Sequence, residues 1–296
     1  MQIGVVFPQT EMPADPGAVR AYAQGVEALG FAHLLAYDHV VGADPAVHQG
    51  WDGPYDVRTT FHEPLTLFAF LAGTCGLELV TGILILPQRQ TALVAKQAAE
   101  VDLLTGGRFR LGVGLGWNLV EYEALGKDFS TRGRRMGEQV ELLRRLWTEP
   151  SVTFEGAYDE VRGAGLAPLP LQRPIPVWFG AASPPAYRRA GRLGDGWFPQ
   201  VPPGHGLEEA RATVEGAARE AGRDPATLGM EGRVSLAAGP ADAALAKALE
   251  HAGRWREAGA SHLSVNTMGA GLGGVDGHLR ALAEVARALG LGAPAA

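Results

Sequence analysis

The chain has 296 residues, 46% of them hydrophobic and 20% charged, with a formal net charge of −6, which is typical of a globular protein. The negative charge argues against a nucleic-acid partner, and the single cysteine, Cys75, excludes an intramolecular disulfide and any multi-cysteine metal site. No uninterrupted apolar run of about 18 residues occurs, and residues 1–7 resemble a strand rather than a signal peptide, so we expect a cytoplasmic protein with no membrane contact.

Short apolar runs alternate with segments of helical periodicity along the chain. The apolar runs predict buried parallel strands at residues 3–7, 33–37, 79–85, 109–113, 176–179, 196–199, 228–236 and 261–266. The segments between them predict helices at residues 17–29, 63–74, 91–104, 133–147, 184–193, 207–221, 242–258 and 275–289. Gly106-Gly107 is a typical stop for the third helix, and Asp242 is expected to cap the seventh.

This alternation predicts a parallel α/β fold, and the eight strand–helix units are the number that closes a (β/α)8 TIM barrel. The alternative is a doubly wound open sheet, which places a glycine-rich phosphate loop directly after its first strand. Here residues 8–13 read Pro-Gln-Thr-Glu-Met-Pro and contain no glycine. We therefore predict a barrel, and because no linker divides the chain, we expect residues 1–296 to form a single domain.

Two connections are longer than ordinary loops. Residues 40–62 follow the second strand, and because loops after barrel strands form the active-site face, we expect them to act as a lid or substrate wall. Residues 148–173 follow the fourth helix and form an insertion, in which residues 152–154 and 158–160 flank a Glu-Gly-Ala turn. This pattern predicts a small hairpin near 148–173.

Candidate functional residues occur where the predicted strands end. Asp38-His39 follows the second strand, and a histidine there either moves a proton near neutral pH or simply bonds a loop carbonyl. Gly82 ends the third strand, where a glycine marks either a bulge against a ligand or plain packing. The glycines of the Gly-Val-Gly-Leu-Gly-Trp-Asn run after the fourth strand would let a flat ligand lie against the backbone at Gly114, with Trp117 as a wall.

The turn at residues 180–184 reads Gly-Ala-Ala-Ser-Pro and joins the fifth strand to a helix. Small residues with a hydroxyl at a helix start can bind an anion through backbone N–H groups and the helix dipole. The alternative is a simple Ser183 cap with Pro184 at the first helical position. Only a bound phosphate distinguishes these two interpretations.

Other charged residues are expected to be structural. Glu121 and Glu123 should face solvent at the start of a helix. The arginines at residues 132, 134 and 135 are expected to form surface or structural ion pairs, with Glu138 or Asp195 as partners. The remaining histidines show no metal-ligand spacing, and hydrolase motifs are absent, so we expect no metal.

Several of these segments belong to one longer series. Residues 86–90, 95–97, 102–109 and 112–118 read LPQRQ, AKQ, DLLTGGRF and GVGLGWN, and the series continues at residues 121–122, 132–135, 146–147 and 194–197. Over about residues 1–200 the chain resembles the luciferase-like monooxygenase superfamily, specifically its subgroup that uses coenzyme F420. Beyond this point only the strand–helix alternation matches.

The resemblance implies an enzyme whose barrel holds F420, or alternatively FMN, at the carboxyl ends of its strands. It implies that Asp38 and His39 lie at the ring, with His39 assisting hydride or proton transfer. It further implies a non-proline cis peptide at Gly82-Ile83 behind the ring. The cofactor phosphate is expected on the turn formed by Gly180, Ala181, Ala182 and Ser183.

The expected function is F420-dependent hydride transfer to or from a small organic substrate, with the cofactor carrying the hard chemistry. Some deazaflavin dehydrogenases of this family place a catalytic glutamate where this chain has Trp117, so a mechanism that uses that glutamate is not expected. The alternatives are an FMN-dependent monooxygenase that uses reduced flavin and oxygen and, in another class, a non-catalytic barrel with a binding role. The resemblance also implies a homodimer.

Overall fold

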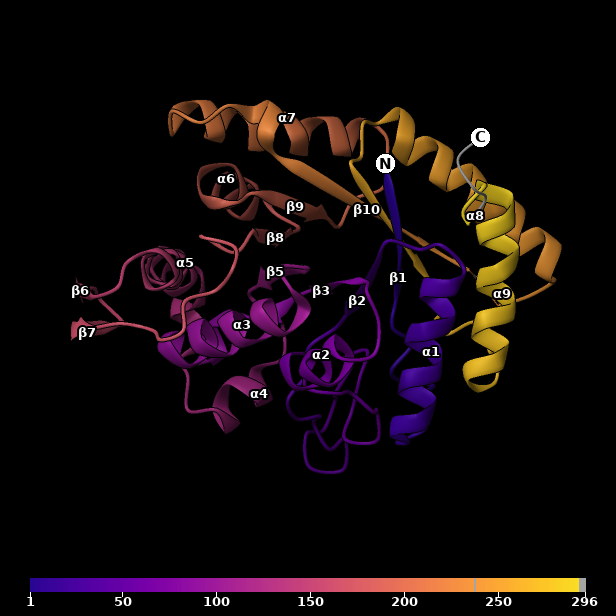
Figure 1. Ribbon diagram of the computed structural model, residues 1–296, viewed down its shortest axis with the longest axis horizontal. Helices are drawn as coiled ribbons and strands as arrows, with labels where there is room; N and C mark the ends of the chain where they lie inside the picture. The colour runs from indigo at the N-terminus through magenta and orange to yellow at the C-terminus, as the bar shows by residue number, and fades with distance from the viewer. Residues whose placement is uncertain (237, 293–296) are drawn as a thin grey trace.

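The computed structural model describes residues 1–236 and 238–292, whose parallel strands form a closed barrel (Figure 1). These strands are β1 (Gln2–Val6), β2 (His33–Ala36), β3 (Glu78–Thr81), β4 (Leu84–Ile85), β5 (Phe109–Gly114), β8 (Val177–Ala181), β9 (Gly196–Pro199), β10 (Gly229–Ser235) and β11 (His262–Asn266). Their order is β3-β2-β1-β11-β10-β9-β8-β5-β4, and a further pairing of β3 with β5 closes the ring. Because β3 and β4 are two halves of one strand interrupted at Gly82 and Ile83, the nine segments make eight barrel strands, which confirms the predicted fold.

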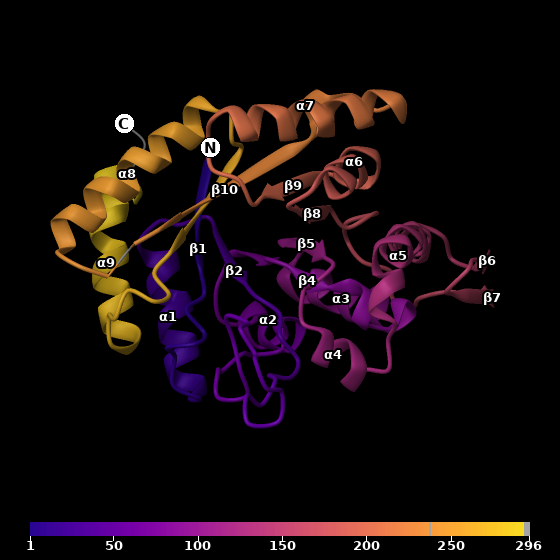
Figure 2. The same ribbon diagram turned by 180° about the vertical axis from the view of Figure 1, so that it is seen from behind.

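Helices cover the outside of the barrel (Figures 1 and 2). The main ones are α1 (Pro16–Ala28), α2 (Pro64–Ala72), α3 (Thr91–Thr105), α5 (Arg132–Thr148), α6 (Pro184–Leu193), α7 (His205–Glu220), α8 (Ala241–Glu257) and α9 (Gly274–Leu289). A short helix, α4 (Leu119–Ala124), follows β5 where a helix start was expected at Glu121 and Glu123, and it adds to the eight helices predicted with bounds. Single 3-10 turns lie at Leu86–Gln88, Phe129–Thr131 and Pro225–Thr227. None of the helices in the described ranges is both long enough and apolar enough to span a membrane.

Local sequence explains where most helices begin and end. Asp15 and Glu63 cap α1 and α2 through side-chain bonds of 2.7 Å to backbone N–H groups of the first turn. Gly106, with a φ of 68°, ends α3 as predicted, because only glycine adopts this conformation readily. The predicted cap of the seventh main helix is wrong, since α8 begins after Pro240 and Asp242 lies in its first turn without a capping bond.

The apolar residues form two layers because side chains alternate between the two faces of each strand. Those that point outward pack against the helices in one large core that includes Tyr22 and Trp147. Those that point into the barrel form a smaller cluster of Val6, Leu35, Val80, Trp178 and Phe198. These side chains therefore occupy part of the barrel interior.

A layer of paired charges lies near the amino ends of the strands. Arg110 donates to Glu231 at 2.7 Å and to Glu78 at 3.1 Å. His33 Nε2 and the Ser264 hydroxyl lie 3.0 and 2.5 Å from the other oxygen of Glu231. Burial alone would raise the pKa of the Glu231 carboxyl, but His33 and Arg110 hold that pKa well below its usual range. The layer is thus a structural floor whose buried charges compensate one another.

The insertion after α5 forms the predicted hairpin. Its strands are β6 (Val152–Glu155) and β7 (Glu160–Ala164), so the second begins at the residue where we expected it to end. The hairpin lies outside the barrel beside α5 (Figure 1). Glu138 on α5 accepts the N–H groups of residues 157, 158 and 159, each at 2.8 Å, which fixes the turn.

This use of Glu138 explains why the predicted ion pairs of the arginine cluster are wrong. Arg132 donates to the Phe129 carbonyl at 2.7 Å, and Arg134 to the hydroxyl of Tyr158 in the hairpin turn at 3.3 Å. The other expected partner, Asp195, pairs with Arg144 at 2.8 Å and not with the cluster.

Candidate active site

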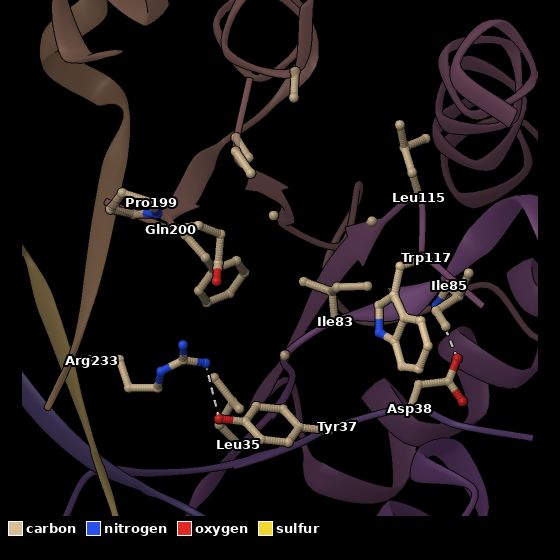
Figure 3. A pocket seen from close by; sticks show the side chains of 18 of the residues that line it. Leu35, Tyr37, Asp38, Ile83, Ile85, Leu115, Trp117, Pro199, Gln200 and Arg233 are labelled. Atoms are coloured by element: carbon tan, nitrogen blue, oxygen red, sulfur yellow. Dashed lines mark hydrogen bonds between the residues drawn. The ribbon is translucent and has the colours of Figure 1, made fainter. Parts of the chain in front are cut away.

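A cavity of about 500 Å³ opens at the carboxyl ends of the barrel strands. Figure 3 shows Ile83, Trp117 and Asp38 on one side of it and Gln200 and Arg233 on the other. The residues that the sequence singled out all line this cavity, namely Asp38, His39, Gly82, Ile83, Gly114, Trp117, Gly180, Ala181, Ala182 and Ser183. Barrel closure therefore brings together the ends of β2, β3, β5 and β8, as one site requires, while the role of each residue stays a prediction.

One wall of the cavity is a smooth apolar surface built around Ile83. The Gly82–Ile83 peptide is cis, as the resemblance predicts. A Cβ at Gly114 would overlap the Ile83 side chain, and a Cβ at Gly180 would lie 3.2 Å from it. The glycines are needed because only their missing side chains let Ile83 lie flat against the ends of β5 and β8.

Asp38 supports this wall from the side of β4. Its carboxylate accepts from Arg89 at 2.7 Å and from the Ile85 N–H at 2.9 Å, the second of which is drawn in Figure 3. Arg89 also donates to Glu63 at the start of α2 at 3.0 Å. Burial raises the pKa of the Asp38 carboxyl, and Arg89 and the Ile85 N–H oppose that effect. Because both oxygens are engaged, the geometry suits a residue that positions the wall.

His39 is held by a buried carboxylate. Glu121 on α4 has no exposed side-chain area, and its Oε1 lies 3.2 Å from Nδ1 of His39. The same oxygen accepts the Val40 N–H at 2.6 Å, and Oε2 accepts from Gln88 at 3.4 Å. Burial alone would raise the pKa of the Glu121 carboxyl, but these donors, His39 foremost, lower it below its usual value. A carboxylate at Nδ1 holds a proton there and leaves Nε2 as the nitrogen free for a ligand.

The expectation that Glu121 faces solvent is therefore wrong, whereas Glu123 on the same helix is exposed as expected. The sequence does contain a signal for this difference. Asn118 caps α4, and its Oδ1 accepts from the N–H groups of Val120 at 3.0 Å and Glu121 at 3.4 Å. An asparagine three residues before a glutamate is typical of a helix start, with the asparagine as the cap. Once the cap position is known, the helical periodicity indicates which residues of the first turn face the barrel.

Aromatic side chains surround His39 and form an aromatic rim beside the cavity, which Tyr55 and Trp117 also line. The ring centroids of Phe61, Tyr55 and Trp117 lie 4.7, 5.1 and 5.6 Å from that of His39. Trp51 lies 5.7 Å from Trp117. The long loop after β2 contributes Pro54 and Tyr55 to the cavity lining, so it forms part of the cavity wall as expected.

The turn after β8 offers fewer donors than an ordinary helix start. Ser183 stands at the cap position of α6 and Pro184 at its first helical position, as the cap interpretation predicts, but the Ser183 hydroxyl makes no capping bond. Pro184 and Pro185 occupy the next two positions and carry no N–H. A phosphate here would be bound by the free Ser183 hydroxyl and by the N–H groups of Ala182, Ser183 and Ala186.

Arg233 and Tyr37 also line the cavity, and neither was singled out from the sequence as a site residue. Arg233 on β10 donates to the hydroxyl of Tyr37 at 3.1 Å (Figure 3). Burial raises the pKa of Tyr37, and Arg233 opposes that effect. The alternation along β10 is the signal that could have found Arg233, because it lies two residues after Glu231 and therefore on the same inward face.

The described part of the chain holds no cluster of three or more His, Cys, Asp or Glu side chains that suits a metal ion. The two carboxylates that line the cavity, Asp38 and Glu231, are paired with Arg89 and Arg110. Within the described residues, Arg233 has no such carboxylate partner. The cavity therefore combines apolar walls with one uncompensated cation.

Comparison with known proteins agrees with this geometry. The model of a family described as luciferase-like monooxygenase matches residues 1–287. An F420-dependent hydroxymycolic acid dehydrogenase of Mycobacterium tuberculosis is 31% identical over 253 residues, which cover 84% of this chain and 66% of the relative. An FMNH(2)-dependent dimethylsulfone monooxygenase of Pseudomonas putida is 33% identical over 201 residues, which cover 66% of this chain and 51% of the relative. The chain thus spans just under two thirds of the first relative and about half of the second.

A solved structure has the same architecture. It is described as an F420-dependent secondary alcohol dehydrogenase in complex with an F420-acetone adduct, and it matches with a TM-score of 0.75 over 96% of this chain and 98% of that chain. The two sequences are 21% identical, so this likeness shows the shared barrel fold alone.

Proposed function

The chain belongs to the luciferase-like monooxygenase family, and on that basis we propose that it is an F420-dependent oxidoreductase that moves hydride between the cofactor and a small organic substrate. The observation that carries this proposal is one cavity that joins a smooth apolar wall, a histidine held at Nδ1 and a small-residue turn. The Asp38-His39 pair and the F420-dependent relative support F420 as the cofactor. In this proposal residues 1–296 act as a single domain.

The residues present fit a planar cofactor with a phosphate. The wall around Ile83 is free of projecting side chains at Gly114 and Gly180, so a flat ring can lie against it. The Ser183 hydroxyl has no capping bond and is available to a phosphate. When bound there, the deazaflavin ring supplies or accepts the hydride.

The protein groups then handle position and protons. His39 holds or accepts a proton at Nε2, while Glu121 keeps the Nδ1 proton in place and fixes the ring orientation. Asp38 acts as a positioning residue, because its bonds to Arg89 and Ile85 hold the wall. The aromatic rim excludes water from His39, which strengthens each of these polar contacts.

Titration of the purified chain with F420 and with FMN, followed by fluorescence quenching, tests the proposal. We expect F420 to bind more tightly. Tight FMN binding without F420 binding would instead support the alternative, an FMN-dependent monooxygenase, which the dimethylsulfone monooxygenase relative favours. Binding of neither cofactor would support the non-catalytic barrel.

A second experiment tests the role of His39. His39→Ala should lower turnover by about 10²–10⁴-fold, the usual contribution of a proton-transfer group, and leave F420 affinity nearly unchanged. His205→Ala is the matched control, because His205 is exposed on α7 and does not line the cavity. Unchanged turnover of the His39 variant would remove this residue from the mechanism.

The homodimer and the cytoplasmic location expected from the sequence belong to the same proposal. The molar mass of the chain in solution, measured by light scattering, tests the first. Fractionation of the source cells tests the second.

A further inference from the structure

A second pocket of about 210 Å³ adjoins the candidate active site. It shares Pro199, Gln200 and Arg233 with the main cavity, so the two spaces meet along this edge. Its remaining walls come from the segment after β9 and from one side of α8. A molecule whose reacting carbon lies in the main cavity can therefore extend into this pocket.

The pocket is lined by basic side chains. Arg233, His251 and Arg254 contribute to it, and no Asp or Glu is present among the described residues that line it. Arg254 donates to the Pro203 carbonyl at 2.6 Å, and Arg233 donates to the hydroxyl of Tyr37, so both make hydrogen bonds to neutral groups. Each guanidinium therefore keeps its charge uncompensated, with further N–H donors to spare.

Packing fixes the two backbone segments from which these side chains extend. Trp255 is buried between α8 and β10, and its indole N–H donates to the Arg233 carbonyl at 3.2 Å. A Cβ at Gly232 would overlap the Trp255 ring, so the helix lies directly against the strand. This contact holds Arg254 on α8 and Arg233 on β10 at the two sides of one opening, and a cleft lined by one sign of charge concentrates the opposite charge.

We infer that this pocket binds an anionic group of the substrate, a phosphate or a carboxylate, separated by a short linker from the carbon that reacts in the main cavity. The inference rests on the proposed function, which places the ring and the reacting carbon beside Ile83. Arginine is suited to the task because its guanidinium binds both anions with two parallel hydrogen bonds. The substrate class is therefore short organic molecules with one acidic end.

Isothermal titration of the chain without cofactor tests the pocket, with inorganic phosphate and acetate as probes. Arg254→Gln removes the charge and keeps a donor for the Pro203 carbonyl, and it should weaken binding of the preferred anion by about tenfold or more. Arg254→Lys keeps the charge but loses the two parallel hydrogen bonds, so its affinity should lie between those of the wild type and Arg254→Gln. Arg256→Gln is the matched control, because Arg256 is exposed on the same helix and does not line the pocket.

Equal affinity of the Arg254→Gln and Arg256→Gln variants, or failure of the wild-type chain to bind either anion, would overturn the inference. A parallel F420 titration distinguishes an anionic group of the substrate from the acidic tail of the cofactor. If Arg254→Gln weakens F420 binding tenfold, the pocket holds the acidic tail of the cofactor and the inference is wrong. If the wild-type chain binds phosphate through Arg254 but does not bind F420, the proposed function fails while the anion site stands.

Discussion

The contact between Glu121 and His39 allows a sharp prediction for the variant Glu121→Gln. The wild-type carboxylate makes charge-assisted bonds to the His39 ring and the Val40 N–H. The amide of glutamine keeps an acceptor for Val40 but presents no charge to His39. A charge-assisted hydrogen bond contributes about 1.5–3 kcal/mol and a neutral one about 0.5–1.5 kcal/mol. The variant should therefore lose about 1–1.5 kcal/mol of the interaction free energy that orients the His39 ring. That loss corresponds to a fall in kcat of about five- to thirteenfold.

The assay is F420-dependent turnover together with F420 affinity. We expect kcat to fall and the Kd for F420 to stay the same, because Glu121 contacts His39 and does not line the cavity itself. Glu123→Gln is the matched control, since Glu123 is exposed on the same helix.

A double variant decides whether Glu121 acts through His39. In the His39→Ala background, Glu121→Gln should have no further effect on kcat, because its partner is gone. Additive losses would show that Glu121 acts elsewhere, and an unchanged kcat in the folded single variant would refute the reasoning altogether.

Three further predictions concern the wall and the floor of the barrel. Gly114→Ala should lower the free energy of unfolding by about 1–3 kcal/mol and weaken F420 binding, because its methyl group would overlap Ile83; unchanged F420 affinity would show that the wall does not face the ligand. Arg89→Ala should cost about 3–5 kcal/mol in chemical denaturation because it leaves the buried Asp38 unpaired, and adding Asp38→Asn should recover part of this loss; no recovery would contradict the pairing. The folded-state pKa of Glu231 is lowered, so its stabilisation is present above about pH 4.3 and is lost as the pH falls; Glu231→Gln should flatten the acid decline of the melting temperature, and an equal slope would contradict the assignment.

The barrel was predictable because each of its units carries its own pattern. The apolar runs and the helical periodicity are local, and the eight units specify closure without knowledge of any contact. The break in the third strand at Gly82 was also readable, since glycine there and the resemblance both point to a special backbone.

Only those site residues that follow a strand end or a glycine could be predicted from the sequence. Glu121 was misplaced because charge alone suggests a surface, and its burial depends on donors from two separate segments, His39-Val40 and Gln88. Arg233 was missed because its role depends on which face of β10 points inward, and on Tyr37, which lies 196 residues away. The Asn118 cap and the alternation along β10 indicate which way each side chain faces, but the partners of Glu121 and Arg233 are distant in the sequence and meet them only when the barrel closes.

The two indole rings at the cavity rim give the enzyme an optical reporter. Trp51 lies on the long loop after β2 and Trp117 follows β5, with ring centroids 5.7 Å apart and Gly53 packed between them. Indoles this close couple their electronic transitions, and the resulting circular-dichroism signal vanishes when the rings separate. Any movement of Trp51 relative to Trp117 would thus be visible on the unlabelled protein, and Trp51→Phe would supply the silent reference.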